Sequence, residues 1–306
     1  MLLREGAKKA VKEELALWLT SRIRAATVIL IIGLQPVASF AAFEVEQWGA
    51  HSAAMGGAFS AHVGTVEGSW FNPALAASMQ VKMFTSTHVQ LFRGVPGGLG
   101  QNLGGVVVPT KYGGFSLSFG QFGDSGYNEQ IFEIGFAKKI HDRLSLGFQL
   151  GNEGWFYDTW ERRDWSASVG GVYEVGWITP GTYARIGLVA RGLGSDTRDL
   201  RGLTGQHPSR YVVALEVRPD QQIFAAELEI ERDELEVRIG CETPLVGDWK
   251  LRFGGNVLSA DTLNRTASIG IGYTWTSIRF DYAYTHSYDL SSFGATHRIG
   301  IGLFGS

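Results

Sequence analysis

The most regularly spaced ionisable side chains lie in the second half of the chain, at every second position. Glu227 and Glu229 are two residues apart, and so are Lys250 and Arg252. Because successive side chains point to opposite faces of a strand, this spacing puts each pair on one face. Neighbouring strands lie about 4.8 Å apart, so opposite charges on that face can pair across strands. We expect one lattice of ion pairs from Glu216, Arg218, Glu227, Glu229, Glu236, Arg238, Lys250, Arg252, Arg279, Asp281 and Arg298.

The other reactive side chains do not form a recognisable site. The lone cysteine, Cys241, excludes an internal disulfide and a cysteine-rich metal site, and we interpret it as a small apolar side chain on a strand. His286 and Ser287 are adjacent, but a catalytic pair would also need an orienting partner. Three further histidines lack the spacing of metal ligands: His51, His62 and His88. The sequence therefore predicts no metal, no cofactor and no enzymatic activity.

The first 41 residues are typical of an export signal. Residues 25–34 are apolar, too short a stretch to span a bilayer, and Arg22 and Arg24 precede them. Small residues at 39 and 41 predict cleavage after Ala41. The preceding segment, residues 1–21, is unusually long and contains three glutamates, which indicates either an early start codon or a short amphipathic helix.

Composition narrows the class of the mature protein. The net charge is −3 without runs of Lys or Arg, so nucleic acid is not an expected partner. Glycine is abundant, at 41 of 306 residues, while charged residues make up only 19%. Glycine and aromatic residues with few charges suit strands that face lipid.

From residue 80 onward, apolar and polar residues alternate with period two. Residues 266–275 place Ala, Ile, Ile, Tyr and Trp on one face, with small and polar residues on the other. The pattern predicts fourteen strands, near residues 80–92, 99–109, 112–122, 128–139, 143–153, 164–176, 181–191, 208–218, 221–231, 234–242, 247–256, 265–275, 277–287 and 293–304. Short turns fall on one side, and the longest loops, 154–163 and 192–206, fall on the other.

These features favour an all-β fold, an antiparallel transmembrane β-barrel of about 14 strands in the bacterial outer membrane. The apolar face carries almost no charge, although a charged residue at the bilayer midplane would cost roughly 2–4 kcal/mol. Aromatic residues gather at strand ends, as in an interfacial girdle: Trp165, Trp177, Trp249, Trp275 and Tyr284. A soluble sandwich also alternates and is the alternative. A barrel implies outer-membrane lipid and the barrel-assembly machinery as partners.

The charged face would then line the lumen. It forms either a structural lattice or an ion-selective constriction. Glycines on the same face leave room for another segment to lie inside: Gly240, Gly254, Gly270, Gly272, Gly300 and Gly302.

Residues 53–77 are the candidate for that inner segment. Gly56 and Gly57 allow positive φ and close backbone approach, while Asn72 and Pro73 favour a capped turn. We expect a compact hatch within residues 42–79, between the signal peptide (1–41) and the barrel (80–306). Its motif residues are Met55, Gly56, Gly57, Phe59, Trp70, Phe71, Asn72 and Pro73.

This motif resembles the N-terminal signature of the FadL superfamily of outer-membrane long-chain fatty-acid transporters. It is similar, more closely still, to PorV/PorQ-like proteins of type IX secretion. The resemblance implies a fourteen-stranded barrel with the segment as a hatch in or beneath its lumen. The sequence departs from the pattern at residues 64–67, where Gly-Thr-Val-Glu replaces the usual acidic pair, and at Leu75, where Gly usually follows Asn-Pro-Ala.

Two functions follow from the resemblance. One is passive transport of hydrophobic small molecules through a hatch-gated lumen. The other is an anchor or adaptor that binds a secreted or surface protein through its outer loops. The expected partner surface in the loop at 154–163 comprises Trp155, Tyr157, Trp160 and Arg162.

Overall fold

The computed structural model describes residues 49–91, 99–123, 127–157, 160–194, 209–231, 234–257 and 265–305. The predicted signal peptide, residues 42–48 and the part of the predicted loop from 195 to 206 lie outside these ranges. None of the described helices is long and apolar enough to span a bilayer.

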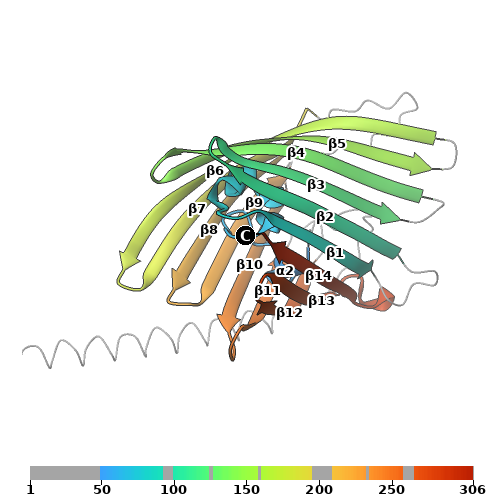
Figure 1. The fold of residues 1–306 in the computed structure, drawn as a ribbon. Helices are drawn as coiled ribbons and strands as arrows, with labels where there is room; N and C mark the ends of the chain where they lie inside the picture. Colours follow the sequence, from blue (N-terminus) through green and yellow to red (C-terminus); the bar gives the residue numbers. More distant parts are fainter. Residues whose placement is uncertain are drawn as a thin grey trace, which may run out of the picture. The chain divides into compact units, whose positions relative to one another are not determined.

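Fourteen antiparallel strands form one closed barrel, in which β1 also pairs with β14 (Figure 1). This confirms the predicted fold class and strand number. The strands are β1 (Met83–Leu91), β2 (Leu99–Thr110), β3 (Gly113–Gly123), β4 (Tyr127–His141), β5 (Leu144–Tyr157), β6 (Trp160–Thr179), β7 (Thr182–Leu193), β8 (Arg210–Pro219), β9 (Ile223–Glu231), β10 (Glu234–Pro244), β11 (Trp249–Val257), β12 (Thr266–Trp275), β13 (Ile278–Ser287) and β14 (Thr296–Phe304).

The apolar face of the strands points outward and the small, polar face points inward. In β9, Phe224, Leu228 and Ile230 are 39%, 46% and 50% exposed, whereas the intervening Glu227 and Glu229 are buried. A wall of exposed apolar side chains around a buried polar interior is the reverse of a soluble sandwich. The barrel therefore spans a membrane.

Two turns on the short-loop side require positive φ at residues other than glycine. Asp220, between β8 and β9, has a φ of 53°, and Thr276, between β12 and β13, has a φ of 51°. The tight turn predicted near residues 276 and 277 is confirmed, because β12 ends at Trp275 and β13 begins at Ile278.

The prediction of a loop at residues 154–163 is wrong. The β5–β6 ladder continues through Gly154 paired with Arg163 and Trp155 paired with Arg162, to Tyr157 paired with Trp160. These residues therefore belong to a long hairpin. Polar and charged residues interrupt the apolar alternation at the end of this hairpin, and backbone pairing does not depend on that pattern.

The N-terminal segment, residues 49–79, lies inside the barrel. It contains two short helices, α2 (Ala50–Ala54) and α3 (Val66–Phe71), and the 3₁₀ helix η1 (Pro73–Ser78). A second 3₁₀ helix, η2 (Ser291–Phe293), precedes β14. α2 packs against β11 to β14, α3 against β1 to β3, and η1 against β2 to β6. The segment therefore contacts most of the circumference of the wall.

The outward orientation of Leu228, in the middle of β9, predicts the effect of a charge there. Arginine on the lipid-facing side near the midplane costs roughly 2–4 kcal/mol. We expect Leu228→Arg to lower the free energy of unfolding in lipid vesicles by about that amount, and the control Leu228→Ala to lower it less. Urea titration of the heat-dependent gel shift measures both. Equal stability of the two variants would contradict a lipid contact at this position.

Candidate functional site

The N-terminal segment is built by capping interactions within its own motif. Thr65 Oγ1 accepts a hydrogen bond from the Gly68 amide at 3.0 Å and caps α3. Asn72 Oδ1 accepts from the Ala74 amide at 3.0 Å and caps η1, where Pro73 is the first residue. An oxygen-bearing side chain at this position satisfies an amide that has no partner within the helix. The Asn-Pro pair thus begins η1.

Glu67 joins the two halves of the motif. It is fully buried on α3, and its Oε2 accepts a hydrogen bond from the Ser52 amide in α2 at 2.8 Å. A Cβ atom at Gly49 would lie 2.2 Å from the Glu67 carboxyl carbon, so only glycine allows this approach. Gly49 also has a φ of 93°. Glu67, the one acidic residue within the departure at 64–67, therefore anchors α2.

Glycines on the inner face of the wall allow the N-terminal segment to approach the wall backbone closely. A Cβ atom at Gly254 would lie 2.1 Å from the Gly56 amide nitrogen, and one at Gly170 would lie 2.0 Å from Asn72 Oδ1. Glycine is the only residue that fits at such approaches. Other wall glycines with would-be Cβ contacts under 3 Å to the segment are Gly105, Gly114, Gly147, Gly187, Gly240 and Gly270.

Wall side chains also bind the backbone of the segment. The amides of Phe59 and Ser60 donate to Glu227 Oε2 at 3.1 and 2.9 Å. Asn72 Nδ2 donates to the Ser60 carbonyl at 2.8 Å and to the Gly171 carbonyl of β6 at 3.1 Å. Asn72 therefore links both halves of the motif to the wall.

Two buried histidines face wall carboxylates. His62 Nδ1 lies 2.7 Å from Glu216 Oε2, and His51 Nε2 lies 3.0 Å from Glu242 Oε2. The two imidazole rings are in edge contact, with centroids 5.0 Å apart. Burial lowers the pKa of His51 to about 3 and also lowers the pKa of His62. His51 is therefore neutral near pH 7, and its contact with Glu242 adds no net cation to the lumen.

The predicted charges on β8 to β13 form a lattice of ion pairs, most of which is buried. Arg238 contacts Glu227, Glu229 and Glu236, and Arg252 bridges Glu242 and Asp281 at 2.7 Å each. Further contacts of the predicted residues include Arg218 with Glu216, Lys250 with Glu242, and Arg279 with Asp281. Arg298 is buried on β14 and donates to Thr285 Oγ1 at 2.9 Å.

The lattice also includes residues that were not predicted, among them Glu242, Arg185 and Arg191. Glu242 of β10 contacts His51, Lys250 and Arg252, while Arg185 and Arg191 of β7 contact Glu216 and Glu229. All three lie on the inner face at positions where the period-two pattern places polar side chains. The alternation could therefore have identified them.

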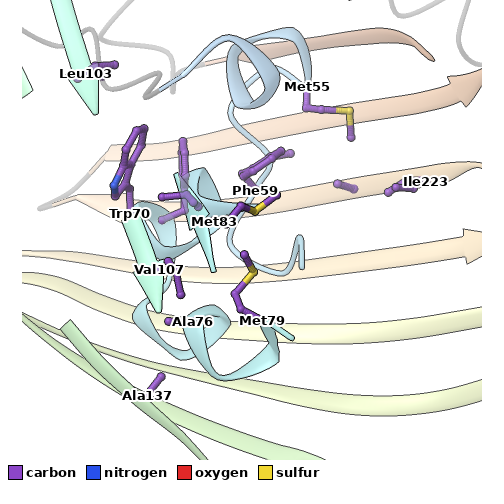
Figure 2. Close-up of a cluster of buried hydrophobic side chains, with 14 of the residues drawn as sticks. Met55, Phe59, Trp70, Ala76, Met79, Met83, Leu103, Val107, Ala137 and Ile223 are labelled. Carbon is purple, nitrogen blue, oxygen red and sulfur yellow. The ribbon is translucent and has the colours of Figure 1, made fainter. Parts of the chain in front are cut away.

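The opposite side of the lumen is uncharged. Over their described residues, β1, β2 and β3 carry no charged side chain on the inner face. Instead, Phe59, Trp70 and Phe71 belong to an apolar cluster with Leu91 of β1 and Leu103 of β2 (Figure 2). Other members from the wall include Met83, Val89, Val107, Ala137 and Ile223. The lumen thus has one charged side and one apolar side.

The residues predicted as a partner surface lie along the β5–β6 hairpin. Trp155 pairs with Arg162, and Tyr157 with Trp160. Next to them, the guanidinium of Arg163 lies 5.3 Å from the centre of the Phe156 ring, and the Arg163 side chain is 54% exposed. A role of these residues in partner binding stays a prediction.

Comparison with known proteins identifies the class of fold. No family model and no curated protein matches the sequence. The toluene transporter TodX of Pseudomonas putida matches with a TM-score of 0.58 and 13% identity, over 86% of this chain and 98% of that chain. The Ralstonia pickettii toluene transporter TbuX matches with a TM-score of 0.56 and 13% identity, over 87% and 100%.

A FadL homologue of Pseudomonas aeruginosa has a TM-score of 0.51 and 12% identity, over 86% of this chain and 99% of that chain. The chain therefore has the fold of FadL-type barrels. This confirms the predicted resemblance at the level of the fold. The comparison with PorV/PorQ-like proteins stays a prediction.

The close approach at Gly254 predicts how the N-terminal segment can be displaced. A valine there would overlap the Gly56 backbone, and overpacking typically costs 1–3 kcal/mol. We expect Gly254→Val to increase amide hydrogen exchange in residues 55–60. The control is Gly302→Ala, also on the inner face, where a Cβ would meet nothing closer than 3.5 Å. Unchanged exchange in Gly254→Val would contradict the contact.

Burial of Glu67 predicts a pH-dependent contribution to stability. Burial raises its pKa from the usual 4.5 to about 7, opposed by Arg279 and reinforced by Asp281, and Arg298 also faces it. Because the folded state favours the protonated form, this contribution is complete below pH 4.5 and is lost as the pH rises through about 7.

Replacement by glutamine keeps an acceptor for the Ser52 amide and removes the titration. We expect the wild type to lose stability relative to Glu67→Gln between pH 4.5 and 8, measured as the urea midpoint. The control is Glu161→Gln, at a residue whose side chain is 55% exposed. Parallel pH profiles of wild type and Glu67→Gln would refute the assignment.

Proposed function

We propose that this protein is an outer-membrane channel for hydrophobic small molecules and that the N-terminal segment is its hatch. The solved structures that share its fold include proteins described as toluene transporters and as a monoaromatic hydrocarbon channel. Their likeness to this chain supports the class of substrate. The arrangement of charged and apolar residues in the lumen supports the path that such a molecule would take, which is described next.

The observation that carries the proposal is the apolar side of the lumen. Trp70 packs against Gly105 of β2 and shares an apolar cluster with Leu103 and Val107, so a hydrophobic molecule that replaced its indole would meet an uncharged strand face. On the other side, a molecule would have to separate buried ion pairs such as Arg252 with Asp281. Breaking a buried pair is strongly unfavourable, about 3–5 kcal/mol when one partner is left alone. The route therefore follows β1 to β3.

The hatch need not leave the barrel for this route to open. Its backbone is held by Glu227 on β9, and Asn72 holds it to β6, whereas Trp70 of α3 meets β2 at Gly105. Side chains reorient much faster than a bound backbone segment can move. We propose that rearrangement of Trp70 and its neighbours opens the path while the hydrogen-bonded side stays in place.

Replacing the indole of Trp70 tests the route. Trp70 is 5% exposed, and its ring atoms lie 2.9 Å from where a Cβ of Gly105 would be. We expect Trp70→Ala to increase the initial rate of toluene uptake into proteoliposomes that carry lipopolysaccharide in the outer leaflet. The matched control is Trp165→Ala, at an outward-facing residue that is 67% exposed, which should leave uptake unchanged.

The possible outcomes distinguish the proposal of transport from the proposal of a path along β1 to β3. If intact protein adds no uptake of toluene or of a fatty acid over empty vesicles, the transport proposal fails. If intact protein transports but Trp70→Ala and Trp165→Ala have equal rates, transport stands and the route along β1 to β3 fails.

A second candidate function rests on the β5–β6 hairpin. It contains the longest strand described, β6, at 20 residues, and Phe156, Glu161 and Arg163 lie on its outward face. Aromatic residues and arginine are enriched where proteins bind one another. An anchor or adaptor that binds a surface or secreted protein there is favoured if the uptake assay shows no transport.

A further inference from the structure

The uncharged side of the lumen carries hydroxyl groups on both sides of one strand. On the inner face of β2, Leu103, Gly105 and Val107 form an apolar stripe, and the indole of Trp70 lies against Gly105. The strands on either side of β2 each place two hydroxyl-bearing residues on the inner face, at alternate positions. These are Thr85 and Thr87 of β1, and Ser116 and Ser118 of β3.

Backbone pairing sets these hydroxyls directly beside the stripe. The register pairs are Gly105 with both Thr85 and Ser118, Leu103 with Thr87, and Val107 with Ser116. Gln101 is the next inner-facing residue of β2, on the side away from the short β2–β3 turn. We call the stripe together with Gln101 and the four flanking residues the hydroxyl track.

Three polar atoms of the track are buried without a partner. Thr87 Oγ1, Ser116 Oγ and Gln101 Oε1 form no hydrogen bond with any residue that the structure describes. These residues are only 1%, 5% and 8% exposed. The other two hydroxyls are bonded, because Thr85 Oγ1 donates to the Ile301 carbonyl at 3.2 Å and Ser118 Oγ donates to Glu133 at 2.9 Å.

Such atoms are unexpected on a path that serves only hydrocarbons. A buried hydroxyl without a partner costs free energy, and an apolar residue of the same shape avoids that cost. Buried polar groups nearly always bond to protein, to water or to a ligand. Because these three atoms face the proposed path, their partner comes from whatever occupies it. Water can serve when the path holds no substrate, and a substrate hydroxyl can displace that water and keep the bonds.

We propose that the hydroxyl track selects hydrophobic molecules that carry one neutral hydrogen-bonding group, of which a phenol is the simplest aromatic case. The inference rests on the proposed function, because the track lies on the proposed path. The apolar body of the molecule replaces the indole of Trp70 against the stripe. Its hydroxyl donates to Gln101 Oε1, and it can both donate to and accept from Thr87 and Ser116.

The three unpartnered atoms lie at successive levels of the path. Along β2, Gln101 comes first, Leu103 marks the level of Thr87, and Val107 marks the level of Ser116. A hydroxyl that moves along the stripe therefore meets a new partner as it leaves the previous one. An ionised group would instead lose its hydration without meeting an opposite charge, because the described inner faces of β1 to β3 carry none.

Toluene and p-cresol are matched probes for this selectivity, because they differ by one hydroxyl group. Initial uptake of each at low concentration is measured in proteoliposomes that carry lipopolysaccharide in the outer leaflet, after subtraction of uptake by empty vesicles. We expect wild-type protein to take up p-cresol faster than toluene. In the double variant Thr87→Val, Ser116→Ala, the ratio of the two rates should fall about fivefold, since a net hydrogen bond is worth roughly a factor of 2 to 10.

The double variant removes no hydrogen bond between described residues, because both hydroxyls are unpartnered there. The matched control is Ser86→Ala, which removes a hydroxyl from the outward face of β1 and should leave the ratio unchanged. Heat-dependent gel mobility checks that each variant is folded.

The outcomes distinguish this inference from the proposed function. An unchanged ratio in the double variant would overturn the inference, because the hydroxyls would then bind water only. Transport of toluene by wild-type protein at least as fast as p-cresol would also overturn it and leave the proposed function intact. Transport of neither probe would overturn the proposed function together with the inference.

Discussion

The structure depends on the requirement that backbone groups in hydrocarbon be hydrogen-bonded within the protein. An open sheet would leave the edges of β1 and β14 unpaired in lipid, and closure through the Met83 to Phe304 ladder removes both edges. Closure of fourteen strands then encloses a lumen too wide for wall side chains alone to fill. The N-terminal segment fills it, which explains why the inner face carries so much glycine: each close approach replaces a side chain of the wall by backbone of the segment.

Filling the lumen with backbone creates a second requirement, because amides buried there also need partners. Glu227 accepts from two consecutive amides, Glu67 accepts from α2, and Asn72 serves both η1 and the wall. Glu227 could not stay ionised in such a place without a cation, and Arg238 supplies it at 3.0 Å. The lattice is therefore best understood as the support of the segment. An ion-selective constriction would need an open path between these charges, and buried side chains such as Glu216 and Arg252 are 1% exposed.

The alternation of apolar and polar residues with period two was enough to predict most of the fold. It located all fourteen strands and the face on which Glu227 or Arg252 lies, because lipid outside and a packed polar lumen inside impose opposite chemistry on alternate residues. The pattern could not predict where β5 ends and β6 begins, because outside the membrane the two faces of a strand no longer have opposite chemistry. It also could not show that Glu67 caps α2 or that His62 meets Glu216, because 15 and 154 residues separate those partners. Contacts of that range depend on how the segment is oriented in the lumen.

The division of the lumen into a charged side and an apolar side follows from the same need to give every buried group a suitable partner. A segment held all round by ion pairs would be fixed, and one held all round by apolar contacts would have no preferred orientation. Here Glu227 of β9, Glu216 of β8 and the bond from Asn72 to β6 set the orientation, while Trp70 of α3 packs against β2. Apolar contacts are non-directional and tolerate rearrangement better than hydrogen bonds do. A movement of the segment that preserves its buried charges therefore begins on the side of Trp70, at β1 to β3, whose described inner faces carry no charge.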